Sequence, residues 1–339
     1  MRILVTGASG FIGRHAALRL AAKGHRVVAT GRDHSRLRGL DISTAVIAAD
    51  LTSDPLMPLL NDCEAVVHCA ALSAPWGRAE DFQRANVDAT RRLALAARKA
   101  GVVRFIHIGS PSIYFRFADQ YEVKEAFTPP KRWITHYARS KWESEETLRS
   151  LHGRVPHALI LRPRAVFGEG DQAILPRLLA MAAGGRFPLI GGGNALIDIT
   201  HIDNVVDAIE LALQADGLPH GRAYNITNGN PIRAGELMSK VFDALNMTVR
   251  WVRLPRKLAL TAAGLAELIA RIRPGCPEPR LTRYGVGVIG YSQTLDISAA
   301  RNELGYEPGI SIDAGIRRFA DYWRGISCGR MEASEHART

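Results

Sequence analysis

The sequence predicts an α/β fold, with a doubly wound parallel sheet and a smaller, mixed second part. Two observations predict it. Short apolar runs alternate with longer helical runs through the first half of the chain. A glycine-rich turn joins the first apolar run to the first helical run. The chain has 339 residues, enough for one large domain or two ordinary ones. Its 47% hydrophobic and 23% charged residues exclude a disordered chain, a collagen-like repeat and a coiled coil.

Six apolar runs are predicted to form the strands of the sheet, and three longer runs between them its helices. The strand segments are rich in Val, Ile and Ala and show no strict alternation of apolar and polar residues, which is typical of parallel strands covered on both faces. The strands are Arg2–Thr6, Arg26–Thr30, Ala45–Ala49, Ala65–Cys69, Phe105–Ile108 and Ala158–Leu161, and the helices are Phe11–Lys23, Asp81–Ala100 and Thr135–Leu151.

After about residue 165 the pattern loosens, because clusters of glycine and proline interrupt it. We therefore expect the sheet domain to cover residues 1–165, with the chain returning to it near 195–228 and 288–300. A second domain would comprise residues 166–194, 229–287 and 301–325. The polar residues 326–339 are expected to be a frayed tail.

The glycine-rich turn has the spacing of a phosphate-binding loop. Gly7, Gly10 and Gly13 follow the first strand and open the first helix. Gly7 permits a tight turn, Gly10 leaves room for a pyrophosphate, and Gly13 lets helix and strand pack closely. The helix start at Phe11 and Ile12 then presents free N–H groups and the positive end of the helix dipole. The context favours a dinucleotide site over an ordinary glycine turn.

The end of the second strand bears on which dinucleotide binds. An acidic residue there would hold the ribose 2′-hydroxyl of NAD, but this chain has Gly31 and Arg32, whose planar fork suits a 2′-phosphate. We therefore favour NADP(H). NAD(H) stays the alternative, because a shift of one residue would bring Asp33 into that position. Asp50 follows the third strand with Leu51 and is placed to accept from the adenine amino group, unless it serves as a helix N-cap.

Three further residues predict a hydride-transfer site. Tyr137 and Lys141 are four residues apart in a helical run, so they share one face. A lysine cation one turn away stabilises a phenolate and lowers the pKa of a tyrosine from its ordinary value of about 10. Ser110 follows a strand and is placed to bind a substrate oxygen, unless it is only an N-cap. Tyr137 would transfer the proton, Ser110 would polarise the carbonyl, and Lys141 would tune Tyr137 and hold the cofactor ribose.

With these motifs the chain resembles the extended short-chain dehydrogenases/reductases over residues 1 to about 325. The matching segments are Thr6–Gly13, Asp50-Leu51, His68–Ala71, Asn86-Val87, Ser110, Tyr137 to Lys141 and Arg162-Pro163. The resemblance implies a Rossmann domain with a smaller C-terminal substrate domain. It also implies that Ala70, Ala71 and Pro163 contact the cofactor and that Asn86 supports the cofactor and active site.

Departures from that pattern indicate which branch of the extended short-chain dehydrogenases/reductases the chain resembles. Ala165 stands where nucleotide-sugar epimerases carry an asparagine, and Pro111 and Ser112 follow Ser110 where sugar-nucleotide dehydratases carry an acidic pair. The chain is instead similar to the 3β-hydroxysteroid dehydrogenase/isomerase-like branch, which includes sterol-decarboxylating dehydrogenases and bacterial 2-alkyl-3-oxoalkanoate reductases. Segments 278–284 and 294–301 carry that similarity.

An apolar pocket is expected from the aromatic residues of both parts. We assign Trp76, Ser112, Tyr114, Arg164 and Phe167 to it. The run 258–272 is apolar nearly all round and predicts either a core helix of the second domain or a helix that meets a membrane surface or a partner.

The sequence shows no residue spacing typical of metal ligands. The resemblance further implies a homodimer, paired through the helices 81–100 and 135–151.

The leading hypothesis is an NAD(P)-dependent oxidoreductase that interconverts a secondary alcohol and a ketone on a bulky apolar substrate, sterol-like or a 3-oxo acid. The alternative is a nucleotide-sugar 4-epimerase that retains NAD.

The net charge of +11 and the pI of about 9.9 also suggest a nucleic-acid-binding or cofactor-sensing function. The basic residues are scattered and form no nucleic-acid motif, so we expect no nucleic-acid partner. The four cysteines form no CxxC pair and no signal peptide is seen, so we expect a cytoplasmic protein.

Overall fold

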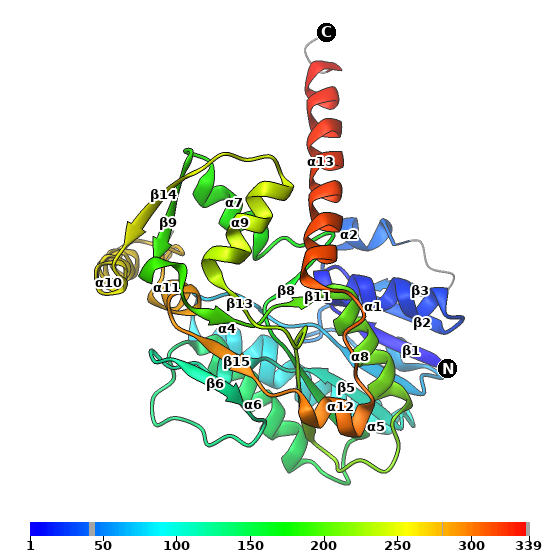
Figure 1. The fold of residues 1–339 in the computed structure, drawn as a ribbon. Coiled ribbons are helices and arrows are strands. Elements are labelled where there is room, and N and C mark those ends of the chain that lie inside the picture. The colour runs from blue at the N-terminus through cyan, green and yellow to red at the C-terminus, as the bar shows by residue number, and fades with distance from the viewer. Residues whose placement is uncertain (41–44, 280, 337–339) are drawn as a thin grey trace.

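The computed structural model describes residues 1–40, 45–279 and 281–336, and these fall into two parts (Figure 1). Within these residues, the first part is a sheet of seven strands, each parallel to its neighbours, with helices on both faces. The second part consists of short strands and helices and is smaller. The predicted α/β class, with a doubly wound parallel sheet and a mixed second part, is confirmed.

The strand order is β12-β7-β5-β4-β1-β2-β3. From β1 the chain builds outward through β2 and β3. It then returns to the other side of β1 and builds outward through β4, β5, β7 and β12. The direction reverses between β1 and β4, and in open parallel sheets ligands bind at the carboxyl ends of the strands at such a point. The strands are β1 (Arg2–Thr6), β2 (Arg26–Gly31), β3 (Ala45–Ala48), β4 (Ala65–His68), β5 (Arg104–Ile108), β7 (His157–Pro163) and β12 (Arg222–Ile226).

The helices of the first part form two layers. Helices α1, α8 and α12 pack on one face of the sheet, and α3, α5 and α6 pack on the other. Their bounds are α1 (Phe11–Ala22), α2 (His34–Arg38), α3 (Met57–Leu60), α4 (Ala79–Phe82), α5 (Ala89–Lys99), α6 (His136–Ser150), α8 (Ile202–Gln214) and α12 (Ser298–Leu304).

Each strand divides its side chains between two cores. In β1, Ile3 and Val5 face the cluster that contains Leu20 of α1, whereas Leu4 faces the opposite cluster with Leu93 of α5. All three β1 side chains are completely buried. Both faces therefore need apolar residues, which is why the strands show no alternation of apolar and polar positions.

The helix expected over residues 81–100 is interrupted by a π-helical segment. This segment, η1 (Gln83–Asp88), lies between α4 and α5. A π-helical turn contains an extra residue, so the side chains after it point in a new direction, and such turns are frequent at functional sites. Asn86 lies in η1 and is 1% exposed. The apolar periodicity predicts the helix but not this change of direction.

Apart from β6, the second part follows β7, and it contains a separate apolar core, whose members include Leu179, Phe187 and Phe242. The chain leaves it to form α8 and β12 of the first part and then returns. The expected domain boundaries stay a prediction. Its elements are β6 (Gln120–Val123), β8 (Val166–Phe167), α7 (Leu175–Ala182), β9 (Arg186–Ile190), η3 (Gly191–Gly193), β10 (Leu196–Ile197), β11 (Thr200–His201), β13 (Ile232–Arg233), α9 (Ala234–Ala244), β14 (Arg250–Leu254), α10 (Arg256–Ile272), α11 (Arg283–Gly290) and β15 (Gln293–Leu295).

The last helix, α13 (Ile312–His336), projects away from the body of the molecule (Figure 1). Its first turns pack on the core of the second part through Ile316 and Phe319. Residues 327–336 of the expected tail have a helical backbone and continue α13, and the tail stays a prediction. This segment contains Met, Glu and Ala, which are good helix formers and continue a helix that packing has already started. Residues 337–339 lie outside the described residues.

Candidate active site

The turn between β1 and α1 depends on its glycines. Gly7 has a φ of +68°, in the left-handed region that favours glycine, and a Cβ there would lie 2.7 Å from the backbone nitrogen of Ala70. A Cβ on Gly13 would lie 2.3 Å from the carbonyl oxygen of Gly7. The N–H of Gly10 donates to the same oxygen at 2.8 Å. The chain therefore passes tightly from strand to helix, close against the end of β4.

The amino end of α1 is left open for an anion. Gly10 is its N-cap and offers no side-chain hydrogen bond, and the first turn, which begins with Phe11 and Ile12, has no acidic residue. The uncapped N–H groups and the helix dipole favour a phosphate at this end. The cradle would be filled by any Cβ at Gly7 or Gly13, so the residues present fit the pyrophosphate of a dinucleotide.

Two charged residues follow β2, and only one of them is committed to a partner. The carboxylate of Asp33 caps α2, accepting from the Ser35 hydroxyl at 2.6 Å and from the Arg36 N–H at 3.1 Å. These hydrogen bonds lower the pKa of Asp33. Arg32 is exposed and makes no hydrogen bond or ion pair with any residue that the structure describes. The free group at this position is therefore a cation.

Asp50 holds the turn that follows β3. Its Oδ1 accepts from the N–H and the hydroxyl of Thr52, both at 2.8 Å. These bonds, helped by the charge of Arg32, lower the pKa of Asp50, so it is ionised at neutral pH. Leu51 beside it is buried. The adenine contacts expected of Asp50 and Leu51 stay a prediction.

Lys141 is a buried cation at the end of β5. It is 3% exposed, and its Nζ donates to the carbonyl oxygen of Ile108 at 2.6 Å. Burial lowers the pKa of Lys141 from 10.5 to about 8, against the opposing effect of the Glu145 carboxylate one turn further along α6. The ammonium is therefore largely charged at neutral pH, but less firmly than a surface lysine.

Tyr137 shares helix α6 with Lys141, and Ser110 follows β5. Helix α6 starts at His136 because Thr135 caps it, accepting from the Ala138 N–H at 3.0 Å, and this places Tyr137 in its first turn. Ser110 comes two residues after Ile108, whose carbonyl holds Lys141. The Ser110 hydroxyl donates to Ser112 Oγ at 2.9 Å and accepts from its N–H at 3.3 Å. Ser110 thus also caps the 3-10 helix η2 (Pro111–Tyr114), the structural role we had weighed.

A chain of buried hydrogen bonds joins the glycine turn to α6. In order, its members are Thr6, His68, Thr90, the carbonyl and side chain of Asn86, Ser140 and the carbonyl of Tyr137. Burial lowers the pKa of His68 to about 3, so its ring is neutral and bridges two hydroxyl groups. The N–H of Ala70 also donates to Thr6 at 3.2 Å, which fixes the half-buried Ala70 and Ala71 beside the turn.

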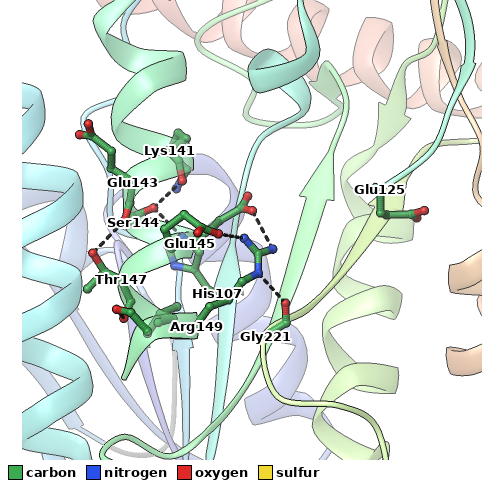
Figure 2. A network of polar contacts seen from close by, with 12 residues as sticks. His107, Glu125, Lys141, Glu143, Ser144, Glu145, Thr147, Arg149 and Gly221 are labelled. Atoms are coloured by element: carbon green, nitrogen blue, oxygen red, sulfur yellow. Dashed lines mark hydrogen bonds and ion pairs between the residues drawn. The ribbon is translucent and has the colours of Figure 1, made fainter. Parts of the chain in front are cut away.

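Behind Lys141, a buried ion pair fastens α6 to the sheet. Arg162 of β7 is 1% exposed and Glu145 is fully buried, and their side chains bond at 2.5 and 3.1 Å. Figure 2 shows Glu145 in this network, with Arg149 beside it at 3.2 Å and bonded in turn to Gly221. The hydroxyl of Tyr114 accepts a further hydrogen bond from Arg162. Two cations thus share the charge of Glu145.

Two residues expected in the substrate pocket belong to the interior. Tyr114 is 1% exposed, and its hydroxyl accepts from Arg162 and donates to Asn225 at 2.9 Å. Phe167 is 2% exposed and packs edge-on against His201 in the core of the second part. A buried tyrosine hydroxyl needs partners, and here the scaffold supplies them; the place of both residues in a substrate pocket stays a prediction.

The other pocket candidates lie where the two parts meet. The indole N–H of Trp76 donates to the carbonyl of Cys276 at 2.9 Å, joining the loop after β4 to the segment after α10. Ser112 is buried beside Ser110. Pro163 ends β7, and Arg164 follows it at the carboxyl edge of the sheet, 4% exposed.

Sequence reasoning missed one residue beside the expected site. The hydroxyl of Tyr284, on α11, interacts electrostatically with Tyr137 and with Arg164. Burial raises the pKa of Tyr284 to about 12, so it is a neutral phenol. Residue spacing could not find it, because α11 and α6 are far apart in the sequence. The only signal was its position in the segment 278–284, which the resemblance had marked.

The model of the NAD dependent epimerase/dehydratase family matches residues 3–227. The chain belongs to this family. YbjS of Escherichia coli (strain K12) is 40% identical over 333 residues, covering 96% of this chain and 98% of YbjS. The 2-alkyl-3-oxoalkanoate reductase of Stenotrophomonas maltophilia (strain K279a) is 31% identical over 332 residues, covering 94% of this chain and 98% of the relative. Human sterol-4-alpha-carboxylate 3-dehydrogenase, decarboxylating, is 28% identical over 336 residues, covering 95% and 88%.

Solved structures of this epimerase/dehydratase family share the fold over nearly the whole chain. MoeE5 in complex with UDP-glucose and NAD is 26% identical, with a TM-score of 0.75 over 96% of this chain and 99% of that one. With relatives named as reductases and dehydrogenases, the family match shows that the protein is an NAD-dependent dehydrogenase/reductase of the extended short-chain type.

Proposed function

We propose that the protein interconverts a secondary alcohol and a ketone on a bulky apolar substrate, either sterol-like or a 3-oxo acid. One observation carries the proposal: the set of Ser110, Tyr137 and Lys141 is complete, while Ala165 replaces the asparagine expected of nucleotide-sugar enzymes. Ala165 also has a φ of +45°, an uncommon conformation for a residue with a side chain, so the backbone differs from ordinary strand geometry here. The names of the reductase and sterol dehydrogenase relatives agree with this substrate class.

The chain's own groups handle the proton. When bound, the nicotinamide supplies or takes up the hydride at the substrate carbon. In reduction, Tyr137 donates its proton to the carbonyl oxygen, and in oxidation it takes that proton from the alcohol. The charge of Lys141 stabilises the phenolate that forms, and the Ser110 hydroxyl donates to the same substrate oxygen. Each reduction thus adds one hydride and one proton across the C=O bond, and water restores the proton of Tyr137.

Aromatic rings next to Tyr284 support an apolar substrate. Phe115 packs edge-on against Tyr284, with ring centroids 5.2 Å apart, and against Phe117 at 5.3 Å. Phe117 is 39% exposed, so this cluster reaches the surface. Such a wall suits an alkyl chain or a ring system better than a sugar nucleotide, which needs polar partners.

The test is oxidation of NADPH or NADH by the purified protein, measured with 2-alkyl-3-oxo acids, 3-ketosteroids and UDP-sugars. Turnover of a lipid-like ketone, lost in Tyr137→Phe, is expected. Turnover of a UDP-sugar alone would overturn the proposal in favour of the nucleotide-sugar 4-epimerase. That alternative is favoured by the fold shared with MoeE5. Because such an epimerase retains NAD, mass spectrometry of the purified protein separates the two: stoichiometric bound NAD supports the epimerase.

We also propose that the cofactor is NADP(H). Arg32 is a free, exposed cation at the end of β2, and Asp33 is already committed to capping α2. A free guanidinium suits a 2′-phosphate, and an acid without spare acceptors suits a 2′-hydroxyl poorly. The binding constants of NADP⁺ and NAD⁺ test this directly, and equal affinities would contradict it.

Helix α10 supports a further proposal, that the protein docks on an anionic membrane surface. One side of the helix packs in a small core through Ala259 and Ala263. Four of its large side chains are nevertheless between 59% and 77% exposed: Leu258, Leu265, Leu268 and Ile272. Exposed Arg250, Arg253, Lys257 and Arg271 lie on or just before the same helix. A basic helix with an apolar face is typical of the lipid interface. Within the part of the chain that is described, no helix is long and apolar enough to span a bilayer.

Flotation with vesicles tests this proposal. Binding to vesicles containing phosphatidylglycerol but not to pure phosphatidylcholine is expected, with loss in Leu265→Ser/Leu268→Ser. Val103→Ser, an exposed apolar residue before β5, is the matched control. No binding to either vesicle would contradict the proposal.

A homodimer through α5 and α6 also stays a proposal. The groove between η1 and α6 is polar, lined by residues that include Gln83, Glu143 and Glu146. Pairing here would therefore rest on polar contacts, and light scattering across a salt series measures it.

A further inference from the structure

Arg164 is a buried cation that the fold leaves without a partner. It is 4% exposed, and its Nε is fully buried with no hydrogen-bond partner. Within the described residues its guanidinium makes no hydrogen bond and no ion pair; Asp198 and Tyr284 act on it only electrostatically, from a longer distance. Burial lowers the pKa of Arg164, and leaving an arginine in this state is costly.

A neighbouring arginine, near the end of β7, shows how the fold satisfies a buried structural cation. Arg162 is as deeply buried, yet it bonds twice to the Glu145 carboxylate, to the Tyr114 hydroxyl and to the Glu125 carbonyl at 3.2 Å. Arg164, two residues later, has none of these. Buried arginines in native structures are nearly always satisfied, so an unsatisfied one indicates a ligand.

The position of Arg164 identifies the ligand as the substrate. It lies at the carboxyl edge of the sheet, after β7, where its N–H donates to Ile226 at the end of β12. Tyr284 interacts electrostatically with both Arg164 and Tyr137. Tyr284 is therefore within electrostatic range of both the proposed proton donor and the unpaired cation.

We propose that Arg164 binds a carboxylate of the substrate, close to the carbon that gains or loses the hydride, and so makes the site selective for a 3-oxo or 3-hydroxy acid over a neutral ketone. This rests on the proposed alcohol–ketone chemistry. Its planar fork suits a carboxylate bidentately. The names of two relatives describe substrates of this shape, since 2-alkyl-3-oxoalkanoates and sterol-4α-carboxylates both carry a carboxylate on the carbon next to the reacting one. Asp198 forms no hydrogen bond or ion pair with Arg164 and acts on it only through its charge; its carboxylate accepts instead from the Leu295 N–H at 2.7 Å.

The test compares a 2-alkyl-3-hydroxy acid with its methyl ester, both oxidised with NADP⁺. The hydroxy acid is chosen because 3-oxo acids lose carbon dioxide spontaneously. The native protein is expected to favour the acid in kcat/KM by about 10- to 100-fold, the range of one charge-assisted contact. Arg164→Gln should raise KM for the acid by that factor and change kcat/KM for the ester less than threefold. Arg164→Lys, which keeps the charge, should recover part of the loss.

Two further measurements separate this role from a structural one and from failure of the proposed chemistry. Arg164→Gln should be at least as stable as the native protein, because it removes an unpaired buried cation, whereas Arg162→Gln should be clearly destabilised. Calorimetric binding of the hydroxy acid to the NADP⁺ complex should be lost in Arg164→Gln even if turnover is slow.

Equal losses of kcat/KM for acid and ester, or a destabilised Arg164→Gln, would overturn the inference while leaving the proposed alcohol–ketone chemistry intact. Binding of UDP-glucose but not of the acid, lost in the same variant, would assign Arg164 to a diphosphate instead. If the acid binds but neither compound is oxidised, the proposed chemistry fails and the carboxylate site stands.

Discussion

Replacing Lys141 by methionine is expected to stabilise the fold while abolishing activity. The lysine is 3% exposed, and its pKa falls from 10.5 to about 8. At about 1.4 kcal/mol per pH unit, burial disfavours its charged form by roughly 3 kcal/mol. Losing the hydrogen bond to Ile108 costs about 1 kcal/mol. Methionine has a similar length and leaves no large cavity. The net gain in the free energy of unfolding is therefore about 2 kcal/mol at pH 7, or roughly 4 °C in Tm.

The gain in the free energy of unfolding of Lys141→Met depends on pH. The pKa of Lys141 is lower in the folded state than in the unfolded state, so the penalty is full below about pH 8 and disappears as pH rises through 10.5. The gain should therefore shrink between these values. Urea unfolding at pH 7 and pH 10, followed by tryptophan fluorescence, measures it. Tyr137→Phe keeps Lys141 and should abolish activity without the gain. A Lys141→Met variant less stable than the native protein at pH 7 would refute the reasoning.

Three other changes test the scaffold and the cofactor site. Glu145→Gln leaves Arg162 buried and without its counter-charge, so urea unfolding should show a loss of about 3–5 kcal/mol; a loss below about 1 kcal/mol would contradict a buried ion pair. Arg32→Ala should weaken NADP⁺ binding about tenfold or more while leaving NAD⁺ binding unchanged, measured by fluorescence titration; equal changes would remove Arg32 from the site. Gly13→Ala would place its Cβ 2.3 Å from the Gly7 oxygen, so cofactor binding should be lost, and near-native affinity would show that the turn relaxes.

The fold was largely predictable because the sheet is buried on both faces, so its strands appear as continuous apolar runs. The strand that these runs did not predict is β12 (Arg222–Ile226). It contains two residues with polar groups, Tyr224 and Asn225, and asparagine is depleted in strands. Their polar groups are satisfied by residues far away in the chain: the Tyr224 hydroxyl bonds Glu303 at 2.8 Å, and the Asn225 amide bonds the Val123 carbonyl at 2.9 Å. Such pairings depend on tertiary contacts that no local pattern contains.

The candidate site likewise has a part that local spacing predicts and a part that depends on tertiary contacts. The glycine turn and the Tyr137–Lys141 pair are local, so spacing along one turn or one helix predicts them. The partner that fastens Lys141's helix could not be predicted, because Glu145 meets Arg162 across two elements. Tyr114 shows the same dependence on tertiary contacts. From its place near Ser110 it is predicted to line a pocket, and the structure adds that its hydroxyl bonds to Arg162 and Asn225.

The sharing of Glu145 sets an alkaline limit on catalysis. Glu145 raises the pKa of Lys141, but its carboxylate is bonded to Arg162 and Arg149, so burial prevails and the pKa of Lys141 stays at about 8. Above that pH the lysine loses its charge, and the Tyr137 phenolate loses the cation that stabilises it. We therefore expect kcat for alcohol oxidation to stop rising, and then to fall, above about pH 8. Arg149→Gln leaves more of the Glu145 charge to act on Lys141, so it should move this limit to higher pH. The pH profiles of the two proteins measure the shift, and a limit that is the same in both would show that Glu145 does not set the charge of Lys141.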